Sequence, residues 1–404
     1  MTPAPQVVVV GAGMAGLRCA LELQGRGLET LVLEAGDAAG GRVRTDEIDG
    51  FLVDRGFQVL LTAYPEARST FDYGELDLMP FVPGALCRRN GGFASIADPL
   101  RNPMEAAAGL LSPVGSPGDI ARLVRLWRTV RRDSLQAVFR RPETTTAARL
   151  DELGFSAQVQ DAFWRPFLRG IFLDPELETS SRLFEFVVRM FTTGDTAVPA
   201  HGMGRLADQL AARLQPGSLR LGARVTGVEP RAVILADGER IAADAVVVAT
   251  TGLVPEVEPA GWHSVTTYAF DAPEPPVRKP VLVLDGTGGG PVSNLHVASA
   301  VSAATAPAGR SLVSATVVGL APDGTEAAVR RQLTGWYGSQ VAGWRLLQEL
   351  RLPHALPVVA PRLRSPRLPS GLYACGDHLI GPTLNAALAS GRRAGAAVSA
   401  DLAR

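Results

Sequence analysis

A G-x-G-x-x-G spacing directly after a short apolar run constrains this chain more than any other feature. Residues 6–10 read QVVVV, which is typical of a strand buried on both faces of a sheet. Gly11, Gly13 and Gly16 follow it. In such a loop the first glycine permits a tight turn, the second lets the backbone approach a pyrophosphate, and the third allows close helix–strand packing. The pattern predicts a strand–turn–helix unit that binds a dinucleotide.

The second predicted strand ends in a carboxylate. Residues 30–34 read TLVLE, so Glu34 lies at the end of the strand, 21 residues after Gly13. A carboxylate in this place can accept hydrogen bonds from both hydroxyls of an adenosine ribose, and it disfavours a 2′-phosphate. These residues therefore predict NAD or FAD rather than NADP, and by themselves they do not separate the first two.

A second pair of glycines follows Glu34. The segment 34–45 reads EAGDAAGGRVRT, and it resembles the extended fingerprint of the flavin amine oxidase, phytoene desaturase and protoporphyrinogen oxidase superfamily. The resemblance implies that the turn formed by Gly40, Gly41 and Arg42 lies near the pyrophosphate of FAD. Paired glycines let the chain pass close to a cofactor, and Arg42 can offer a charge-assisted hydrogen bond to a phosphate.

The end of the chain is similar to the second FAD motif of the same superfamily. Residues 371–377 read GLYACGD, and an alanine-rich helix is predicted to follow. The resemblance implies that Gly376 and Asp377 lie at the ribityl hydroxyls. A helix that begins near Leu384 would aim its N–H groups at the flavin C2 carbonyl, where its dipole favours the reduced cofactor. Two motifs near opposite ends of the chain thus imply one cofactor, FAD.

Two further segments extend the resemblance over most of the chain. Residues 199–206 (PAHGMGRL) resemble the superfamily's return from the substrate domain to the FAD domain, and Val225 matches the position whose backbone contacts adenine. The complete set of predicted FAD-binding residues is Gly11, Gly13, Met14, Ala15, Gly16, Glu34, Ala35, Gly40, Gly41, Arg42, Val225, Gly376, Asp377, Thr383, Leu384 and Asn385.

Buried-type strands near both ends of the chain and near residues 245–250 predict an α/β fold with a discontinuous domain. A Rossmann-type FAD-binding domain would be assembled from residues 1–60, 198–255 and 353–404. A second, α+β substrate domain would comprise residues 61–197 and 256–352. Within these limits the patterns predict helices over about 99–214 and 324–350, strands over 264–320, and a proline-rich linker over 353–369.

The charge balance and the cysteines argue against several other classes. Forty basic and forty acidic residues give zero formal net charge, so no overall field favours nucleic acid. Cys19, Cys87 and Cys375 are far apart and no CxxC occurs, so neither a disulfide framework nor a metal site is predicted. No apolar run is long enough to span a membrane and no charged leader precedes the first one, which favours a cytoplasmic protein. The arginine-rich amphipathic stretch 120–132 leaves peripheral membrane contact open.

A missing lysine bears on the substrate. Amine-oxidising members of the superfamily carry a lysine on a substrate-domain strand near the flavin, and the matching strand here, 264–270 (SVTTYAF), has Thr266 or Thr267 in that place. The resemblance therefore favours the desaturase and protoporphyrinogen oxidase branches. In these the flavin takes a hydride from a C–C or C–N bond of an apolar small molecule, and the electron acceptor stays open.

Two residues are candidates for catalysis. His378, beside Asp377, is a candidate acid–base group, and Tyr268 is a candidate aromatic residue of the substrate pocket. Further aromatic candidates, whose presence core packing would also explain, are Phe163, Trp164 and Phe167.

Other functions on the same scaffold stay open. An isomerase could use reduced FAD without net redox chemistry, and a flavin-binding protein need not turn over at all. A disulfide reductase would need a redox CxxC and a second dinucleotide loop. The sole rival loop, GTGGG at 286–290, runs into Pro291 and is predicted to be a hairpin turn.

Overall fold

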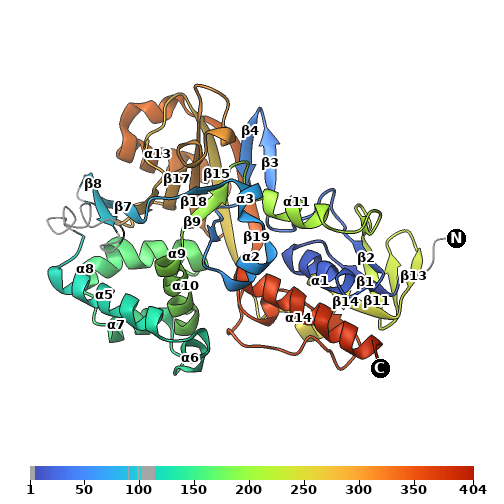
Figure 1. Ribbon diagram of the computed structural model, residues 1–404. Helices are drawn as coiled ribbons and strands as arrows, with labels where there is room; N and C mark the ends of the chain where they lie inside the picture. The colour runs from blue at the N-terminus through green and yellow to red at the C-terminus, as the bar shows by residue number, and fades with distance from the viewer. Residues whose placement is uncertain (1–4, 90, 98–100, 102–113) are drawn as a thin grey trace.

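The computed structural model describes residues 5–89, 91–97, 101 and 114–404. One of its two large sheets is parallel, with five strands in the order β10–β2–β1–β14–β20. These strands are β1 (Val7–Val10), β2 (Thr30–Leu33), β10 (Leu219–Arg220), β14 (Ala245–Val248) and β20 (Tyr373–Ala374). Stretches far apart in the sequence therefore meet in one sheet, and the C-terminal helix lies on its side of the molecule (Figure 1).

The two faces of this sheet are covered differently. The side chains of Val7 and Val9 pack with α1 (Met14–Gln24), α11 (Arg205–Ala212) and α14 (Leu384–Leu402). Val8 and Val10 pack with a small antiparallel sheet. Its strands are β11 (Val225–Glu229), β12 (Ala232–Leu235) and β13 (Arg240–Ala242). A run of four valines is thus buried on both faces, as its composition predicts.

The second large sheet is mixed and has seven strands in the order β19–β15–β18–β17–β16–β7–β8. The strands are β7 (Gly84–Arg89), β8 (Gly92–Ala97), β15 (Trp262–Ala272), β16 (Leu282–Asp285), β17 (Val292–Val297), β18 (Ser311–Val318) and β19 (Arg345–Pro357). One face packs on α13 (Thr325–Tyr337), and α9 (Arg165–Phe172) packs against β16, β17 and β18.

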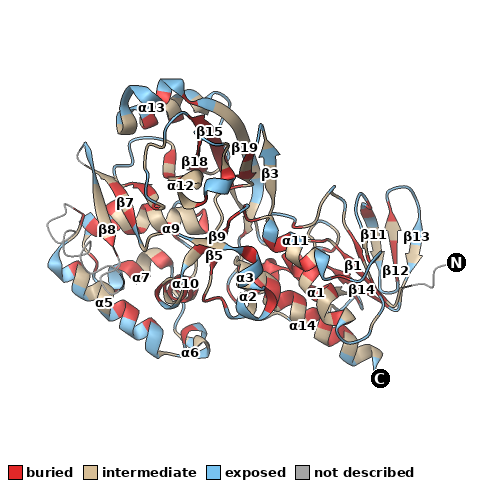
Figure 2. Ribbon diagram, turned by 45° about the horizontal axis from the view of Figure 1, so that its top comes forward, coloured by how far each residue is buried: buried red, intermediate tan, exposed pale blue. Residues whose placement is uncertain are grey.

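Helices fill the space beneath this sheet (Figure 1). They are α5 (Pro117–Arg132), α6 (Leu135–Arg140), α7 (Thr146–Glu152), α8 (Ala157–Val159), a π-helix (Gln160–Trp164), α9 and α10 (Ser181–Thr193). A capping box formed by Ser116 and Asp119 begins α5, and its apolar side is buried through Leu126, Trp127 and Val130. The outer side of α5 is exposed (Figure 2). Among the described residues no helix is both long and apolar enough to cross a bilayer.

Short elements connect the two large sheets. β3 (Thr45–Ile48) and β4 (Phe51–Asp54) form a hairpin. β5 (Leu60–Leu61) and β6 (Leu78–Pro80) both pair with β9 (Thr196–Pro199), and α2 (Pro65–Thr70) and α3 (Tyr73–Leu76) lie between them in the chain.

The α/β fold with a Rossmann-type sheet is confirmed, and the glycine run 286–290 is the predicted hairpin turn, here between β16 and β17. The prediction for 324–369 is wrong in two places. The helix ends at Tyr337, and residues 345–357 form β19, which pairs with β15 along its whole length. Helix-compatible residues therefore become a strand through tertiary pairing, and prolines are tolerated because β19 is an edge strand. Most of the predicted helical start, 99–113, lies outside the described residues, and the domain limits stay a prediction.

Candidate functional site

The three glycines after β1 play different roles. Gly11 has a φ of +106°, and its N–H donates to the Leu33 carbonyl at 2.8 Å. A Cβ at Gly16 would lie 1.9 Å from the Gly11 carbonyl oxygen, so only glycine fits there. A Cβ at Gly13 would meet no protein atom within 4 Å. The fold therefore requires glycine at positions 11 and 16, whereas Gly13 leaves open a space that the protein itself does not fill.

The N-terminus of α1 faces this space without a cap. Gly13 is the N-cap residue and makes no side-chain capping bond, and the first turn contains no acidic residue. Met14 and Ala15 in that turn are buried. Backbone N–H groups and the positive end of the helix dipole therefore remain available to an anion, which is the chemistry of a pyrophosphate site.

Glu34 lies directly beside the glycine loop. Its carboxylate accepts hydrogen bonds from the N–H groups of Ala12 and Gly36, both at 2.8 Å. The Ala223 N–H donates to the Glu34 carbonyl at 2.8 Å, which brings the chain just before Val225 alongside. Glu34 thus helps hold the loop in this structure, in addition to the ribose contact predicted for it. Ala35 is exposed next to it.

The second glycine pair packs directly on the first loop. The Gly40 N–H donates to the Ala12 carbonyl at 2.8 Å, and Gly40 forms a bridge with Gly13. A Cβ at Gly41 would lie 3.3 Å from Gly13 Cα, and both glycines of the pair have positive φ. The absence of side chains lets two backbone segments meet at the open space, as expected for a cradle around a cofactor.

Arg42 joins this cradle to the other end of the chain. Its guanidinium contacts the Asp377 carboxylate at 2.6 Å and donates to the Ala355 carbonyl at 2.8 Å. It also lies over the Trp262 ring, 5.7 Å from the centroid. The side chain of Asp377 is only 7% exposed, whereas that of Arg42 is 41% exposed. Two predicted motifs that are 335 residues apart therefore meet through one ion pair.

His378 lies against the same motif. Its backbone N–H donates to Asp377 Oδ1 at 3.0 Å, and its buried Nε2 atom has no partner among the described residues. A Cβ at Gly376 would lie 2.2 Å from the imidazole, so the ring occupies space that only glycine leaves. Burial lowers the pKa of His378, and the attraction of Asp377 opposes this. A neutral imidazole with an unused nitrogen is suited to exchange a proton or to bind a polar group.

The start of α14 completes the group of predicted residues. Thr383 caps the helix by accepting a hydrogen bond from the Ala386 N–H at 3.0 Å. Asn385 Oδ1 accepts from the Glu66 N–H at 3.0 Å, and Glu66 binds Arg392 through both carboxylate oxygens. The side chain of Asn385 therefore holds α2 against α14 in this structure. Leu384, at the first position of α14, is partly buried.

The structure does not bring Tyr268 to these residues. Its ring is fully buried with Phe270 and Trp344 on the α13 face of the sheet, and its hydroxyl has no partner among the described residues. The structure gives no support to a role for Tyr268 in catalysis. Thr266 bonds backbone groups of Gly319 and Ala321, whereas Thr267 faces the opposite side. Trp164 is buried in the core, and Phe163 and Phe167 stack beside it and are partly buried.

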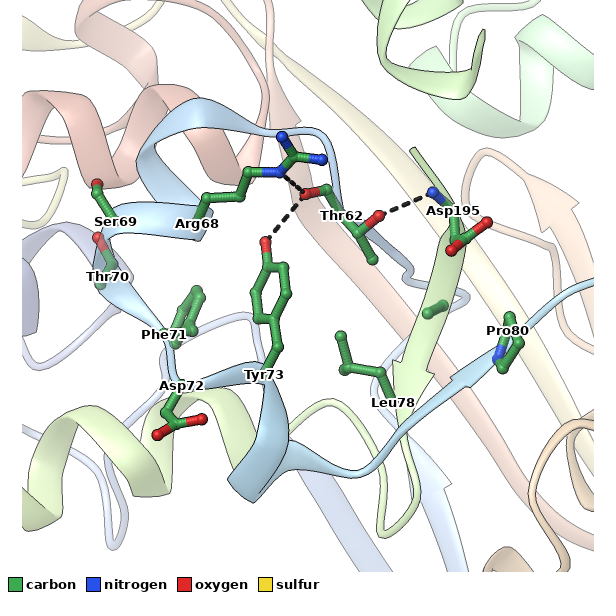
Figure 3. Close-up of a pocket in the computed structure, with 11 residues that line it drawn as sticks. Thr62, Arg68, Ser69, Thr70, Phe71, Asp72, Tyr73, Leu78, Pro80 and Asp195 are labelled. Atoms are coloured by element: carbon green, nitrogen blue, oxygen red, sulfur yellow. Dashed lines mark hydrogen bonds between the residues drawn. The ribbon is translucent and has the colours of Figure 1, made fainter. Parts of the chain in front are cut away.

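A pocket of about 910 Å³ lies elsewhere, between α2, α3 and β9 (Figure 3). Arg68 and Tyr73 both donate to the Thr62 carbonyl there, and Thr62 Oγ1 accepts from the Asp195 N–H. None of the predicted cofactor residues lines this pocket. We therefore place the candidate site at the glycine loops.

Asp54 links the segments that flank the glycine loops, and its ionisation predicts how the stability of the protein depends on pH. Its Oδ1 atom accepts hydrogen bonds from Thr45 Oγ1 at 2.5 Å and from the Met203 N–H at 2.9 Å. Burial raises the pKa of this carboxyl to about 6, although both hydrogen bonds act in the opposite direction. The segment 199–206 is thereby attached to β3 and β4.

We expect Asp54→Asn to flatten the pH dependence of stability. The native state binds more protons than the unfolded state between the ordinary pKa of an aspartate, about 3.9, and about 6. The contribution of the Asp54 carboxyl to the free energy of unfolding is therefore fully present below the ordinary pKa. It is lost as the pH rises through about 6, and the loss is at most about 3 kcal/mol. Thermal unfolding across this range checks it, with the exposed Asp208→Asn as control. An unchanged pH profile in Asp54→Asn would contradict the assignment.

Comparison with known proteins agrees with this geometry. The arrangement is that of a dinucleotide-binding flavoprotein. The family model for flavin containing amine oxidoreductase matches residues 14–399, and the chain belongs to this family. The family's flavin cofactor is FAD, and the glycine loops described above fit it.

The relatives are diverse. Polyamine oxidase 1 of Oryza sativa subsp. japonica is 27% identical over 70% of this chain and 60% of its own length. Phytoene dehydrogenase of Streptomyces griseus is 31% identical over 61% of this chain and 54% of its own length. The chain thus matches little more than half the length of these relatives.

Solved structures share the fold at low identity. Cyclohexylamine oxidase from Brevibacterium oxydans superposes with a TM-score of 0.72, at 16% identity and 100% coverage of both chains. Reduced UDP-galactopyranose mutase reaches a TM-score of 0.68, at 15% identity over 98% of this chain and 95% of its own. At such identities the likeness concerns the fold alone.

Proposed function

We propose that this protein oxidises a C–C or C–N single bond of an apolar small molecule to a double bond, in which one carbon loses a hydride to FAD and the neighbouring carbon or nitrogen loses a proton to solvent. The contact between Arg42 and Asp377 carries the proposal, because it joins the glycine loops at the start of the chain to the motif at its end. Bound FAD supplies the two-electron chemistry, and oxygen or another acceptor takes the electrons afterwards. The chain's own residues bind FAD, orient the substrate beside it and shield both from water.

The residues divide this work along the cofactor. The N-terminus of α1, the space at Gly13 and the guanidinium of Arg42 are placed for the pyrophosphate, and Glu34 for the adenosine ribose. Asp377 is placed for the ribityl hydroxyls. We expect His378, buried and neutral, to hold a proton at Nε2 or to orient a polar group beside the cofactor.

The seven-stranded sheet supports a substrate other than an ordinary amine. Thr266 or Thr267 stands where the resemblance places a lysine in amine-oxidising members, and both threonines are buried. The family relatives include a phytoene dehydrogenase and a hydroxyneurosporene desaturase, which supports an apolar substrate. A mutase among the fold neighbours keeps a non-redox isomerase with reduced FAD as the alternative.

Anaerobic mixing separates these functions. The FAD-loaded protein is mixed without oxygen with a polyene hydrocarbon, a porphyrinogen or a primary amine, and the visible flavin band is followed. Bleaching by the polyene or the porphyrinogen is expected, and bleaching by the amine alone would contradict the proposal. Turnover that requires prior reduction of the flavin and leaves the band unchanged would establish the isomerase. Failure to take up FAD at all would refute both.

A further inference from the structure

Three polar side chains on the face of the seven-stranded sheet opposite α13 have atoms without a partner among the described residues. Asn294 on β17 and Thr316 on β18 lie opposite each other, and both are at least 98% buried. Their Oδ1 and Oγ1 atoms make no hydrogen bond, and neither does Nδ1 of His296, two residues further along β17. Buried polar atoms are nearly always bonded, so three unused ones on one surface indicate a ligand that supplies the bonds.

The pairing of the strands fixes the face on which these groups lie. Thr316 pairs with Asn294, and His296 lies two residues further along β17, so these three side chains share one face of the sheet and form a polar row. Thr267, which pairs with Thr316, lies on the same face. The alternate residues, such as Tyr268 and Leu295, point into the core beneath α13. The row therefore belongs to the face on which α9 packs.

A glycine in α9 marks a close approach to this row. A Cβ at Gly170 would lie 3.3 Å from Asn294 Oδ1. The helix backbone thus comes close to the amide without supplying it a hydrogen bond. His296 as a whole residue is partly exposed, although its Nδ1 atom is buried.

A short chain of contacts connects the row to the cofactor cradle. The His296 ring lies 4.5 Å from the Phe57 ring, measured between centroids. The neighbouring Gln58 donates from Nε2 to the Arg42 carbonyl at 2.7 Å and to the Arg55 carbonyl at 2.9 Å. The loop between β4 and β5 therefore makes two contacts. Gln58 bonds the glycine–arginine turn, and Phe57 contacts His296.

The row carries no formal charge. Asn and Thr are neutral, and burial lowers the pKa of His296 to about 4, which keeps its imidazole neutral near pH 7. Phe57 and Phe81 both lie against the imidazole and make the surroundings apolar. An ammonium group would lose its hydration here without gaining a counter-ion, whereas a neutral oxygen would find donors and acceptors.

We propose that Asn294, His296 and Thr316 form a polar subsite that binds a neutral hydroxyl or carbonyl group on an otherwise apolar substrate. The inference rests on the proposed function for the position of the substrate beside the cofactor. It goes further by naming a polar group of the substrate and the residues that select it.

Small probes of one skeleton test the subsite. Cyclohexanol, cyclohexanone, methylcyclohexane and cyclohexylammonium are titrated into the FAD-loaded protein, and binding is followed by saturation-transfer NMR. The alcohol or the ketone is expected to bind at least about 5-fold more tightly than methylcyclohexane and cyclohexylammonium, the size of one to two net hydrogen bonds. Equal binding of all four probes would overturn the subsite.

Variants then identify the atoms involved. His296→Leu, Asn294→Leu and Thr316→Val should each reduce the preference to less than about 2-fold, because each removes one orphan atom at nearly constant volume. His296→Asn should retain it, since its amide places a polar atom where Nδ1 lies. The control is Thr325→Val at the first residue of α13. It removes a hydroxyl that donates only to the Pro322 carbonyl, and it should leave the probe preference unchanged.

The FAD absorption band and the melting temperature of every variant separate the two proposals. Wild-type protein that takes up no FAD refutes the proposed function. Wild-type protein that takes up FAD but shows no preference for the oxygen-bearing probes refutes the subsite alone. Loss of FAD uptake in both His296→Leu and His296→Asn would show that the imidazole supports the cofactor loop, and this also overturns the subsite.

Discussion

Gly13→Ala should give a folded protein that no longer holds FAD. The added methyl group meets no protein atom within 4 Å, and φ is −71°, which any residue adopts. Loss of the glycine N-cap costs no more than about 1 kcal/mol of stability. The methyl group instead enters the space kept for the pyrophosphate, so we expect FAD affinity to fall by at least about 30-fold. Titration with FAD and thermal unfolding of the apoprotein measure the two effects separately.

Two other glycines serve as controls for this result. Gly16→Ala places its Cβ 1.9 Å from the Gly11 carbonyl oxygen, so it should destabilise the apoprotein itself by about 3 kcal/mol or more. Gly335→Ala on α13 also meets no atom within 4 Å and should leave FAD binding unchanged while adding helix propensity. If Gly13→Ala binds FAD as tightly as Gly335→Ala, the open space does not belong to the cofactor.

The strand–turn–helix unit with its glycines was predictable because its constraints are local. Gly11 has a positive φ, and a Cβ at Gly16 would meet the Gly11 carbonyl oxygen only five residues earlier, so this short segment requires glycine at both positions. The meeting of Arg42 with Asp377 could be inferred only through the resemblance, because nothing in either segment specifies the other.

The polar face of the seven-stranded sheet was not predictable, because it depends on which strands pair with one another. Alternation in β15 shows that Tyr268 and Thr267 point to opposite faces, but it does not reveal which face is the core. His296 becomes notable only when β17 lies beside β18 and the loop with Phe57 covers it. The signal available was weak: a histidine alternating with an asparagine in an apolar strand, among five histidines in the chain.

Arg42→Leu and Asp377→Asn should rescue each other in stability but not in cofactor binding. Arg42→Leu leaves a carboxylate that is 7% exposed without its cation, and we expect the apoprotein to lose about 1–3 kcal/mol. Adding Asp377→Asn removes that charge, so the double variant should be more stable than Arg42→Leu. This coupling is the signature of a contact between the two side chains in the apoprotein.

FAD binding should follow the opposite order. The two side chains are placed for different groups of the cofactor, a phosphate for Arg42 and the ribityl hydroxyls for Asp377, so removing both leaves two groups without partners. Each single variant should weaken FAD binding by about 10- to 100-fold, the size of one charge-assisted hydrogen bond, and the double variant should bind most weakly. Arg240→Leu, which breaks the exposed pair with Glu229, controls for loss of an arginine. If the double variant regains affinity together with stability, the ion pair only holds the two motifs in place, and neither side chain touches the cofactor.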